Sequence, residues 1–144
     1  MCMYQRDYIL RMIEMLARLI AGILKLIKSG DMNQASQALQ NAYGVAFQNE
    51  SLTLKTIPEE ELIETLLQVH NYTTGHLEML AELFFAEAGL LLAEKKYAQS
   101  MLFYRKSLSL YEYIDRETHS YSQERQDRMK EIKERLGDES LNKT

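Results

Sequence analysis

The segment from residue 4 to residue 28 constrains the fold of this 144-residue chain most strongly. Its charged side chains recur at helical spacings along one stripe, at Asp7, Arg11, Glu14, Arg18 and Lys25. Nearly every other position from 9 to 27 is apolar. The apolar surface is therefore much wider than the roughly 100° stripe of an ordinary surface helix, and we expect a helix that is covered on nearly all sides.

The rest of the chain also favours helices, because it contains few residues that break them. One proline and six glycines occur in the whole sequence, and these are the usual residues at helix ends. The apolar pattern predicts helices at residues 4–28, 32–47, 58–69, 74–94, 97–114 and 122–136, with a loop at 48–57. The length suits one domain. We therefore predict a single all-α domain of five or six antiparallel helices over residues 1–136, with a frayed tail at 137–144.

A tight turn is predicted between the first two helices. Gly30 suits the left-handed position that commonly ends a helix, and Asp31 can cap the next helix together with Gln34. The second helix then carries Ala35 and Ala42 on one side. Because these residues are small, we expect the two helices to pack closely as a hairpin.

The last two helices are expected to differ in how they pack. In residues 97–114, Tyr97, Tyr104 and Tyr111 follow the seven-residue period of a packing seam, so we assign them to the core. In residues 122–136, the apolar positions form only a narrow line through Met129 and Ile132. That helix is predicted to be a polar cap over an open end of the fold.

Two hairpins resemble the tetratricopeptide repeat (TPR), a 34-residue helix-turn-helix unit whose second helix has small residues at fixed places. In LLAEKKYAQSMLFYRKSLSL, the turn aromatic, the two small positions and the aromatic between them are Tyr97, Ser100, Ser107 and Tyr104. In LIKSGDMNQASQALQNAY, the turn, the small positions and the large residue between them are Gly30-Asp31, Ala35, Ala42 and Leu39. The resemblance implies a degenerate TPR-like arrangement that binds a protein or peptide.

The opening residues YQRDYILRMIEMLARLI resemble the start of a family of short bacterial helical proteins of unknown function that carry TPR-like hairpins. This resemblance implies a bacterial cytosolic protein, and it makes Asp7, Tyr8, Arg11 and Glu14 positions of interest. The alternative is that the charged residues among them form only an ion-pair stripe on the helix surface.

Charge and cysteine content limit the partners and the compartment. The net charge is −4, and residues 50–94 carry −8, a surface that repels phosphates, so we expect no nucleic-acid partner. The charges of residues 4–28 argue against a membrane span. The only cysteine, Cys2, can form no disulfide within the chain, and no signal-peptide pattern is visible, so we expect a cytoplasmic protein.

No motif in the sequence indicates an enzyme or a bound cofactor. Phosphate-binding glycine loops, nucleophile elbows, HExxH and CxxC patterns are absent. His70 and His76 straddle a predicted helix start, so they do not share a helical face on which a metal could bind. Glu78 and Glu82 could act as an acid–base pair, but an i,i+4 pair of glutamates is more typical of an exposed helix edge.

Two classes of function remain open. The first is a non-enzymatic interaction module that binds a protein or peptide, through an acidic edge at Glu78, Glu82 and Glu87 or through Asp7, Arg11 and Glu14. Because the helix at 4–28 is so widely apolar, we expect this module to be a homodimer through that helix. The second is a small-molecule or catalytic site inside the bundle, with a lining of Tyr72, His76, Phe85 and Tyr104.

Overall fold

The computed structural model describes the backbone of residues 3–142 and the side chains of residues 6–137. Every regular element in this range is a helix, so the predicted all-α class is confirmed. Cys2 lies outside the described residues.

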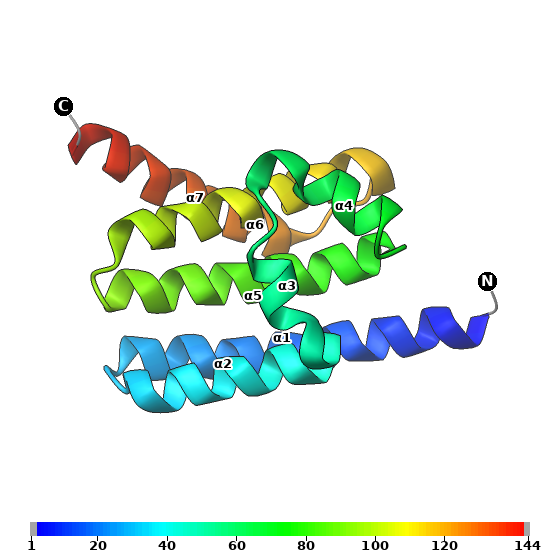
Figure 1. Ribbon diagram of the computed structural model, residues 1–144, viewed down its shortest axis with the longest axis horizontal. Helices are drawn as coiled ribbons and strands as arrows, with labels where there is room; N and C mark the ends of the chain where they lie inside the picture. The colour runs from blue at the N-terminus through cyan, green and yellow to red at the C-terminus, as the bar shows by residue number, and fades with distance from the viewer. Residues whose placement is uncertain (1–2, 143–144) are drawn as a thin grey trace.

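The helices form two long antiparallel hairpins, a capping helix and a short helical crossing (Figure 1). The first hairpin comprises α1 (Met3–Lys28) and α2 (Met32–Phe47), and the second comprises α5 (Thr74–Ala93) and α6 (Tyr97–Thr118). Helix α7 (Gln123–Asn142) packs on α6. The crossing contains the 3-10 helix η1 (Gln48–Glu50), α3 (Ser51–Lys55), the 3-10 helix η2 (Glu59–Glu61) and α4 (Leu62–Gln68).

Helix α5 lies at the centre, in contact with α1, α2 and α6. Its side chains are buried on several sides, as its largely apolar sequence requires. The largest of them, Phe84 and Phe85, meet Phe103 and Tyr104 of α6 edge to face, with ring centroids 5.2 and 5.8 Å apart. The core of the domain therefore surrounds α5.

The turn between α1 and α2 has the predicted caps. Gly30 adopts a left-handed conformation with φ of 86°. The Gly30 and Asp31 amides donate to Ile27 O and Leu26 O, the last carbonyls of α1, at 3.1 and 2.9 Å. Asp31 Oδ1 accepts from the Gln34 amide at 3.4 Å. The tight hairpin predicted from these residues is confirmed.

The small residues of α2 and α6 that match the repeat pattern are buried. Ala35, Ala42, Ser100 and Ser107 are all fully buried. Ser100 Oγ donates to Ala88 O at 2.7 Å, and Ser107 Oγ donates to Ala81 O at 2.8 Å. Each serine hydroxyl thus donates to a backbone carbonyl of α5, so neither buried serine lacks a hydrogen-bond partner.

The tyrosine seam of α6 is only partly buried. Tyr104 and Tyr111 lie in the core, as predicted, but Tyr97 is 57% exposed, so its assignment to the core is wrong. Tyr97 is the first residue of α6 and follows directly on the turn from α5, so it stands at the edge of the packed surface.

Helix α7 is the predicted polar cap. Ile132 and Met129 are buried against the rest of the core, and the positions around them are mostly exposed. The helix continues to Asn142, past the predicted boundary at residue 136, and residues 143–144 lie outside the described part of the chain.

The predicted loop at residues 48–57 is wrong, because η1 and α3 occupy most of it. Helix α3 has only five residues and is held by tertiary contacts. Lys106 of α6 donates from Nζ to Lys55 O at the end of α3, at 2.9 Å, and burial lowers the pKa of this lysine. Arg105 pairs with Glu59 at 3.3 Å, which fixes the crossing to α6 a second time.

Within the described residues, no helix combines the length and the apolar character that a membrane crossing requires.

Candidate functional site

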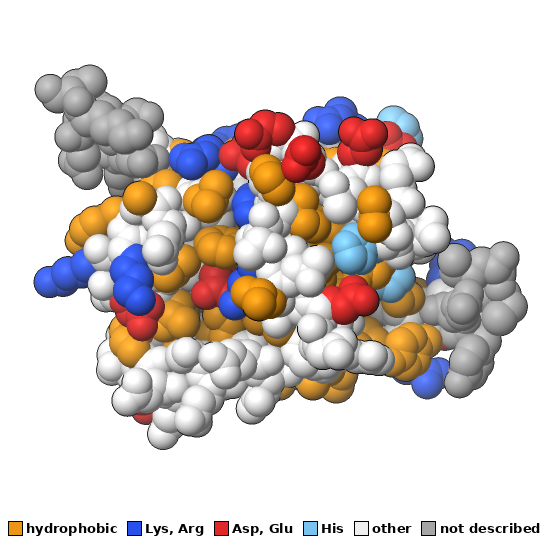
Figure 2. Space-filling model, viewed as in Figure 1, with side chains coloured by type: hydrophobic (Ala, Val, Ile, Leu, Met, Phe, Trp, Pro, Cys, Tyr) orange, Lys and Arg blue, Asp and Glu red, His pale blue; other side chains and the backbone are white. Residues whose placement is uncertain are grey.

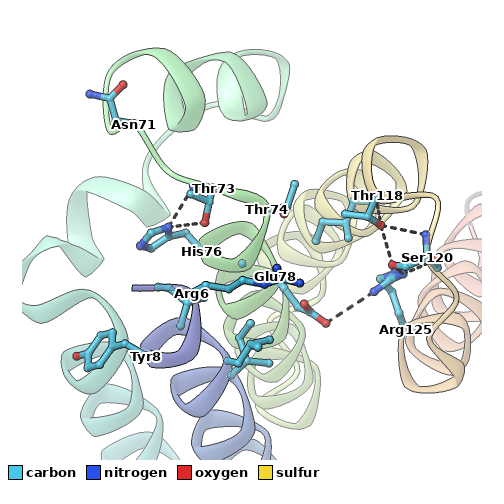
Figure 3. A pocket seen from close by; sticks show the side chains of 15 residues that line it. Arg6, Tyr8, Asn71, Thr73, Thr74, His76, Glu78, Thr118, Ser120 and Arg125 are labelled. Carbon is cyan, nitrogen blue, oxygen red and sulfur yellow. Dashed lines mark hydrogen bonds and ion pairs between the residues drawn. The ribbon is translucent and has the colours of Figure 1, made fainter. Parts of the chain in front are cut away.

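A cavity of about 720 Å³ opens at one end of the bundle (Figure 3). Its walls come from the first turns of α1, the segment before α5, the start of α5, the end of α6 with the turn that follows, and the first turn of α7. One side is apolar and includes Ile9, Ile13 and Ile114, whereas the other is polar and includes Glu78 and Arg125. This volume lies within the usual range for small-molecule sites, roughly 300–1,000 Å³.

Arg125 organises the polar wall. It is only 5% exposed, and its Nε donates to Asp115 Oδ1 at 2.6 Å. Its Nη2 donates to Ser120 O at 2.9 Å, while Nη1 lies 3.7 Å from Glu78 Oε1. Figure 3 shows the Glu78 carboxylate pointing toward Arg125 from α5. The tight partner of Arg125 is therefore Asp115, and Glu78 interacts with it at longer range.

The two carboxylates beside Arg125 differ in their titration. Burial raises the pKa of Glu78, and the Arg125 charge offsets only part of this effect. Partial burial also acts to raise the pKa of Asp115, but hydrogen bonds from Arg125 and Gln126 outweigh it and hold that pKa below its usual value. Asp115 is thus the charged partner of Arg125, and Glu78 is the carboxylate of the wall that is available to contact a ligand.

His76 closes the cavity at the start of α5. The Thr73 amide donates to His76 Nδ1 at 3.1 Å, as half of a capping box. The neutral ring therefore carries its proton on Nε2. Burial lowers the pKa of His76, which favours this neutral form.

An aromatic stack continues outward from His76. The Tyr72 ring lies between His76 and His70, with centroid separations of 4.7 and 5.1 Å. Tyr72 donates from its hydroxyl to Glu50 Oε2 at 3.0 Å, and His70 Nδ1 lies 3.5 Å from the same oxygen. The stack joins the segment before α5 to η1, and it is a structural support behind the cavity wall.

The ligand-lining set predicted from the sequence does not come together. His76 lines the cavity, but Tyr72 stacks behind it. Phe85 and Tyr104 are buried against each other in the core. No pattern in the sequence singles out Arg125 or Asp115, because these residues stand among many charged side chains and only the turn after α6 brings them to Glu78.

The predicted acidic edge of α5 is also wrong, because its three glutamates are paired within the chain. Glu78 faces Arg125 as described. Glu82 accepts a hydrogen bond from the Tyr111 hydroxyl and pairs with Arg128 at 3.3 Å. Glu87 pairs with Lys55 at 3.1 Å. Since α5 is the central helix, helices on either side cover the positions that its own sequence suggested were free.

The three carboxylates therefore present no continuous acidic surface. On the face that Figure 2 shows, acidic side chains gather instead over the α4 segment, among lysines and arginines.

The third group of predicted residues, Asp7, Arg11 and Glu14, is exposed on α1. The opposite side of this helix packs into the core through Leu16, Ile20 and Ile23. We define the outer face of α1 as its exposed charged stripe with the large apolar side chains beside it: Asp7, Tyr8, Leu10, Arg11, Glu14, Arg18 and Leu19.

Exposed apolar side chains lie on both flanks of the charged stripe of α1, with Tyr8 and Leu19 on one flank and Leu10 on the other, and Tyr8 and Leu10 also line the cavity. Tyr8, Leu10 and Leu19 are 56%, 50% and 39% exposed. The N-terminal part of α1 also extends beyond the end of α2 (Figure 1), so α2 does not cover it there. We expected α1 to be covered on nearly all sides, but the chain itself covers only one side of this helix.

Within residues 6–137, no three histidine, cysteine, aspartate or glutamate side chains lie close enough together to hold a metal ion. Comparisons with protein-family models, with curated proteins and with solved structures found no match for this chain. Function is therefore inferred from the geometry of the chain.

Proposed function

We propose that this protein is a non-enzymatic interaction module that forms a homodimer through the outer face of α1. The observation that carries the proposal is the exposure of Tyr8, Leu10 and Leu19 on a helix that packs into the core only through its other side. Large apolar side chains that gather on a surface and are rimmed by charges are typical of protein–protein contact sites. The single cysteine is consistent with a cytoplasmic location.

The architecture supports an interaction role in a second way. The two hairpins pack together, with α5 against both α1 and α2, and the small residues of their second helices are buried. This arrangement agrees with the TPR-like pattern of the sequence, in which stacked hairpins present surfaces to a protein or peptide. A TPR-like module needs no catalytic group.

The first test is the solution mass across a dilution series, measured by light scattering. We expect a dimer at micromolar concentration that dissociates on dilution. Leu10→Glu places a charge on the outer face and should shift the midpoint of dissociation to at least tenfold higher concentration. The matched control is Leu52→Glu, because Leu52 is 74% exposed on α3, outside the proposed interface. A wild-type chain that is monomeric throughout the series, or equal effects of the two substitutions, would contradict the proposal.

The second candidate function is small-molecule binding in the cavity, and the observation that favours it is the mixed wall around Glu78 and Arg125. A thermal-shift screen with small metabolites tests it, because a ligand at 100 times its dissociation constant adds about 2.7 kcal/mol to stability. A ligand bound at this wall should lose affinity in Glu78→Gln and keep it in Glu134→Gln, which alters an exposed carboxylate of α7 outside the cavity. A screen without reproducible shifts would leave the cavity without a ligand role.

A further inference from the structure

We propose that two copies of this chain pair antiparallel through α1, about a twofold axis that passes between the two helices at the level midway between Met12 and Ile13. In this arrangement Asp7 pairs with Arg18 of the second copy, and Arg11 pairs with Glu14 of the second copy. The inference rests on the proposed homodimer and specifies its geometry.

The first observation is that the four charged residues occupy one exposed strip of the helix. Asp7, Arg11, Glu14 and Arg18 are all exposed. At 3.6 residues per turn they fall within an arc of about 60°. The buried residues Leu16, Ile20 and Ile23 lie on the opposite side of α1. A second helix laid along the strip would therefore meet all four charges at once without disturbing the core.

The second observation is the order of the charges, which alternates from acidic to basic along the strip. In an antiparallel pair, the Asp7–Arg18 pair and the Arg11–Glu14 pair have the same midpoint along the helix. One twofold axis at that level therefore generates both ion pairs. In a parallel pair, each charge would face its own copy, and like charges would meet at every position. Because like charges across an interface are strongly unfavourable, the pattern selects the antiparallel orientation.

One competing antiparallel register exists. Sliding the second helix by seven residues would pair Asp7 with Lys25, and Glu14 with Arg18, of the second copy. Arg11 would then face Ala21 and have no acidic partner. The proposed register uses all four charges of the N-terminal part of α1, so we favour it.

The apolar side chains fit the same axis. A twofold axis of this kind brings each flank of the helix against the same flank of the second copy. Tyr8, Met15 and Leu19 share one flank, and Tyr8 then lies between Met15 and Leu19 of the second copy. Burial of these side chains supplies the affinity, because exposed ion pairs contribute little to it, and the charges fix orientation and register.

Charge exchange tests the pairing of Arg11 with Glu14. In the proposed register Arg11→Glu and Glu14→Arg each place like charges together twice per dimer, so each should raise the dimer dissociation constant about tenfold or more. The double variant R11E/E14R restores opposite charges and should return the constant to within about threefold of the wild-type value. Circular dichroism of each variant checks that α1 is still helical. An R11E/E14R chain as weak as the single variants would overturn the register.

Cysteine cross-linking tests orientation directly. In a Cys2→Ser background, a mixture of the Asp7→Cys chain and the Arg18→Cys chain should form a mixed disulfide under mild oxidation, because facing Cα atoms of an antiparallel pair approach within disulfide range. Asp7→Cys alone should not link to itself, whereas a parallel dimer would link in that way. A link from Asp7→Cys to Lys25→Cys would indicate the competing register. Leu52→Cys, on α3, is the control for collisional linking.

The two experiments separate failure of the geometry from failure of the homodimer. A chain that dimerises by light scattering but gives the wrong cross-links contradicts the geometry alone. A chain that remains monomeric and forms no cross-link contradicts both proposals.

Discussion

At the scale of single residues, Glu82 has the densest set of polar contacts on α5. It accepts from the buried Tyr111 hydroxyl and from Arg128 Nε and Nη2, at 3.3 and 3.4 Å from the arginine. Burial and the Glu82 charge together raise the pKa of Tyr111 well above its usual value. The Arg128 guanidinium also lies 4.7 Å from the centre of the Phe85 ring. One carboxylate thus ties α5 to both α6 and α7.

Replacing Glu82 with glutamine should therefore destabilise the fold. The amide can still accept from Tyr111, but it deprives the partly buried Arg128 of its hydrogen-bonded counter-charge, and we expect a loss of about 1–3 kcal/mol in the free energy of unfolding. Urea denaturation followed by circular dichroism measures the change. Glu124→Gln removes an exposed carboxylate and should stay within about 0.5 kcal/mol of wild type. Equal stabilities of the two variants would show that the Glu82 contacts contribute nothing.

His76 gives the stability a defined dependence on pH. Burial lowers the pKa of His76 in the folded state, whereas the value in the unfolded chain is about 6.5. As the pH falls through 6.5, the unfolded chain takes up this proton first, so the contribution of His76 to stability is lost between pH 6.5 and its lower folded pKa. The proton also removes Nδ1 as the acceptor for the Thr73 amide.

The matched variant is His76→Gln, because glutamine at the same position can keep the capping box but does not titrate. We expect its stability, measured by urea denaturation from pH 7 to pH 5, to fall less steeply than that of the wild type. If the two slopes are the same, His76 is not the group responsible.

Residue-scale pairing is also where sequence reasoning was weakest. The sequence placed Glu78, Glu82 and Glu87 on one side of a helix, and that placement alone suggested an exposed edge. Their partners Arg125, Arg128 and Lys55 lie on other elements, more than 30 positions away along the chain. A periodic pattern within one helix carries no information about which distant cation will meet it.

At the scale of elements, the long helices could be predicted and the short ones could not. The hairpin turn at Gly30 has strong local signals, and the structure contains them as expected. Helix α3 has five residues, too few to be stable from its own propensity. It forms because Lys106 and Glu87 reach it from α6 and α5.

The packing of α1 on α5 depends on one glycine. A Cβ atom on Gly75 would lie 2.5 Å from Ile9 Cγ2 and 3.6 Å from Ile13 Cδ1, so α1 would have to move. We expect Gly75→Ala to destabilise the protein by about 1–3 kcal/mol in thermal or urea denaturation, through overpacking.

Two controls identify the cause of that effect. Gly44→Ala in α2 meets nothing within 4 Å and should stabilise the protein by roughly 0.5–1 kcal/mol through helix propensity. Ile9→Ala removes the clashing methyl group, so it should cost less in the Gly75→Ala background than in the wild type. Additive effects of the two substitutions would argue against the contact.

At the scale of the whole molecule, composition and periodicity were sufficient for the fold class but not for the cavity. Scarce proline and glycine together with helical apolar spacing predict an all-α fold, which the structure confirms. The cavity forms where the ends of α1, α5 and α6 meet, so it depends on the relative lengths and positions of helices. The sequence likewise indicated that α1 needs extensive cover, but only the packed fold shows which side the chain leaves open.

The central position of α5 also has a consequence for the rate of folding. A turn of three residues, 94–96, joins α5 to α6, whereas α1 and α2 reach α5 only across the 48–73 segment. Contacts between near neighbours in sequence form at lower loop-closure cost, so the α5–α6 hairpin should be structured early in the transition state. In stopped-flow measurements, Phe85→Leu should mainly slow refolding, and Ile20→Val in α1 should mainly accelerate unfolding. The α1–α2 hairpin would then be the last part to pack during folding and the first to detach during unfolding.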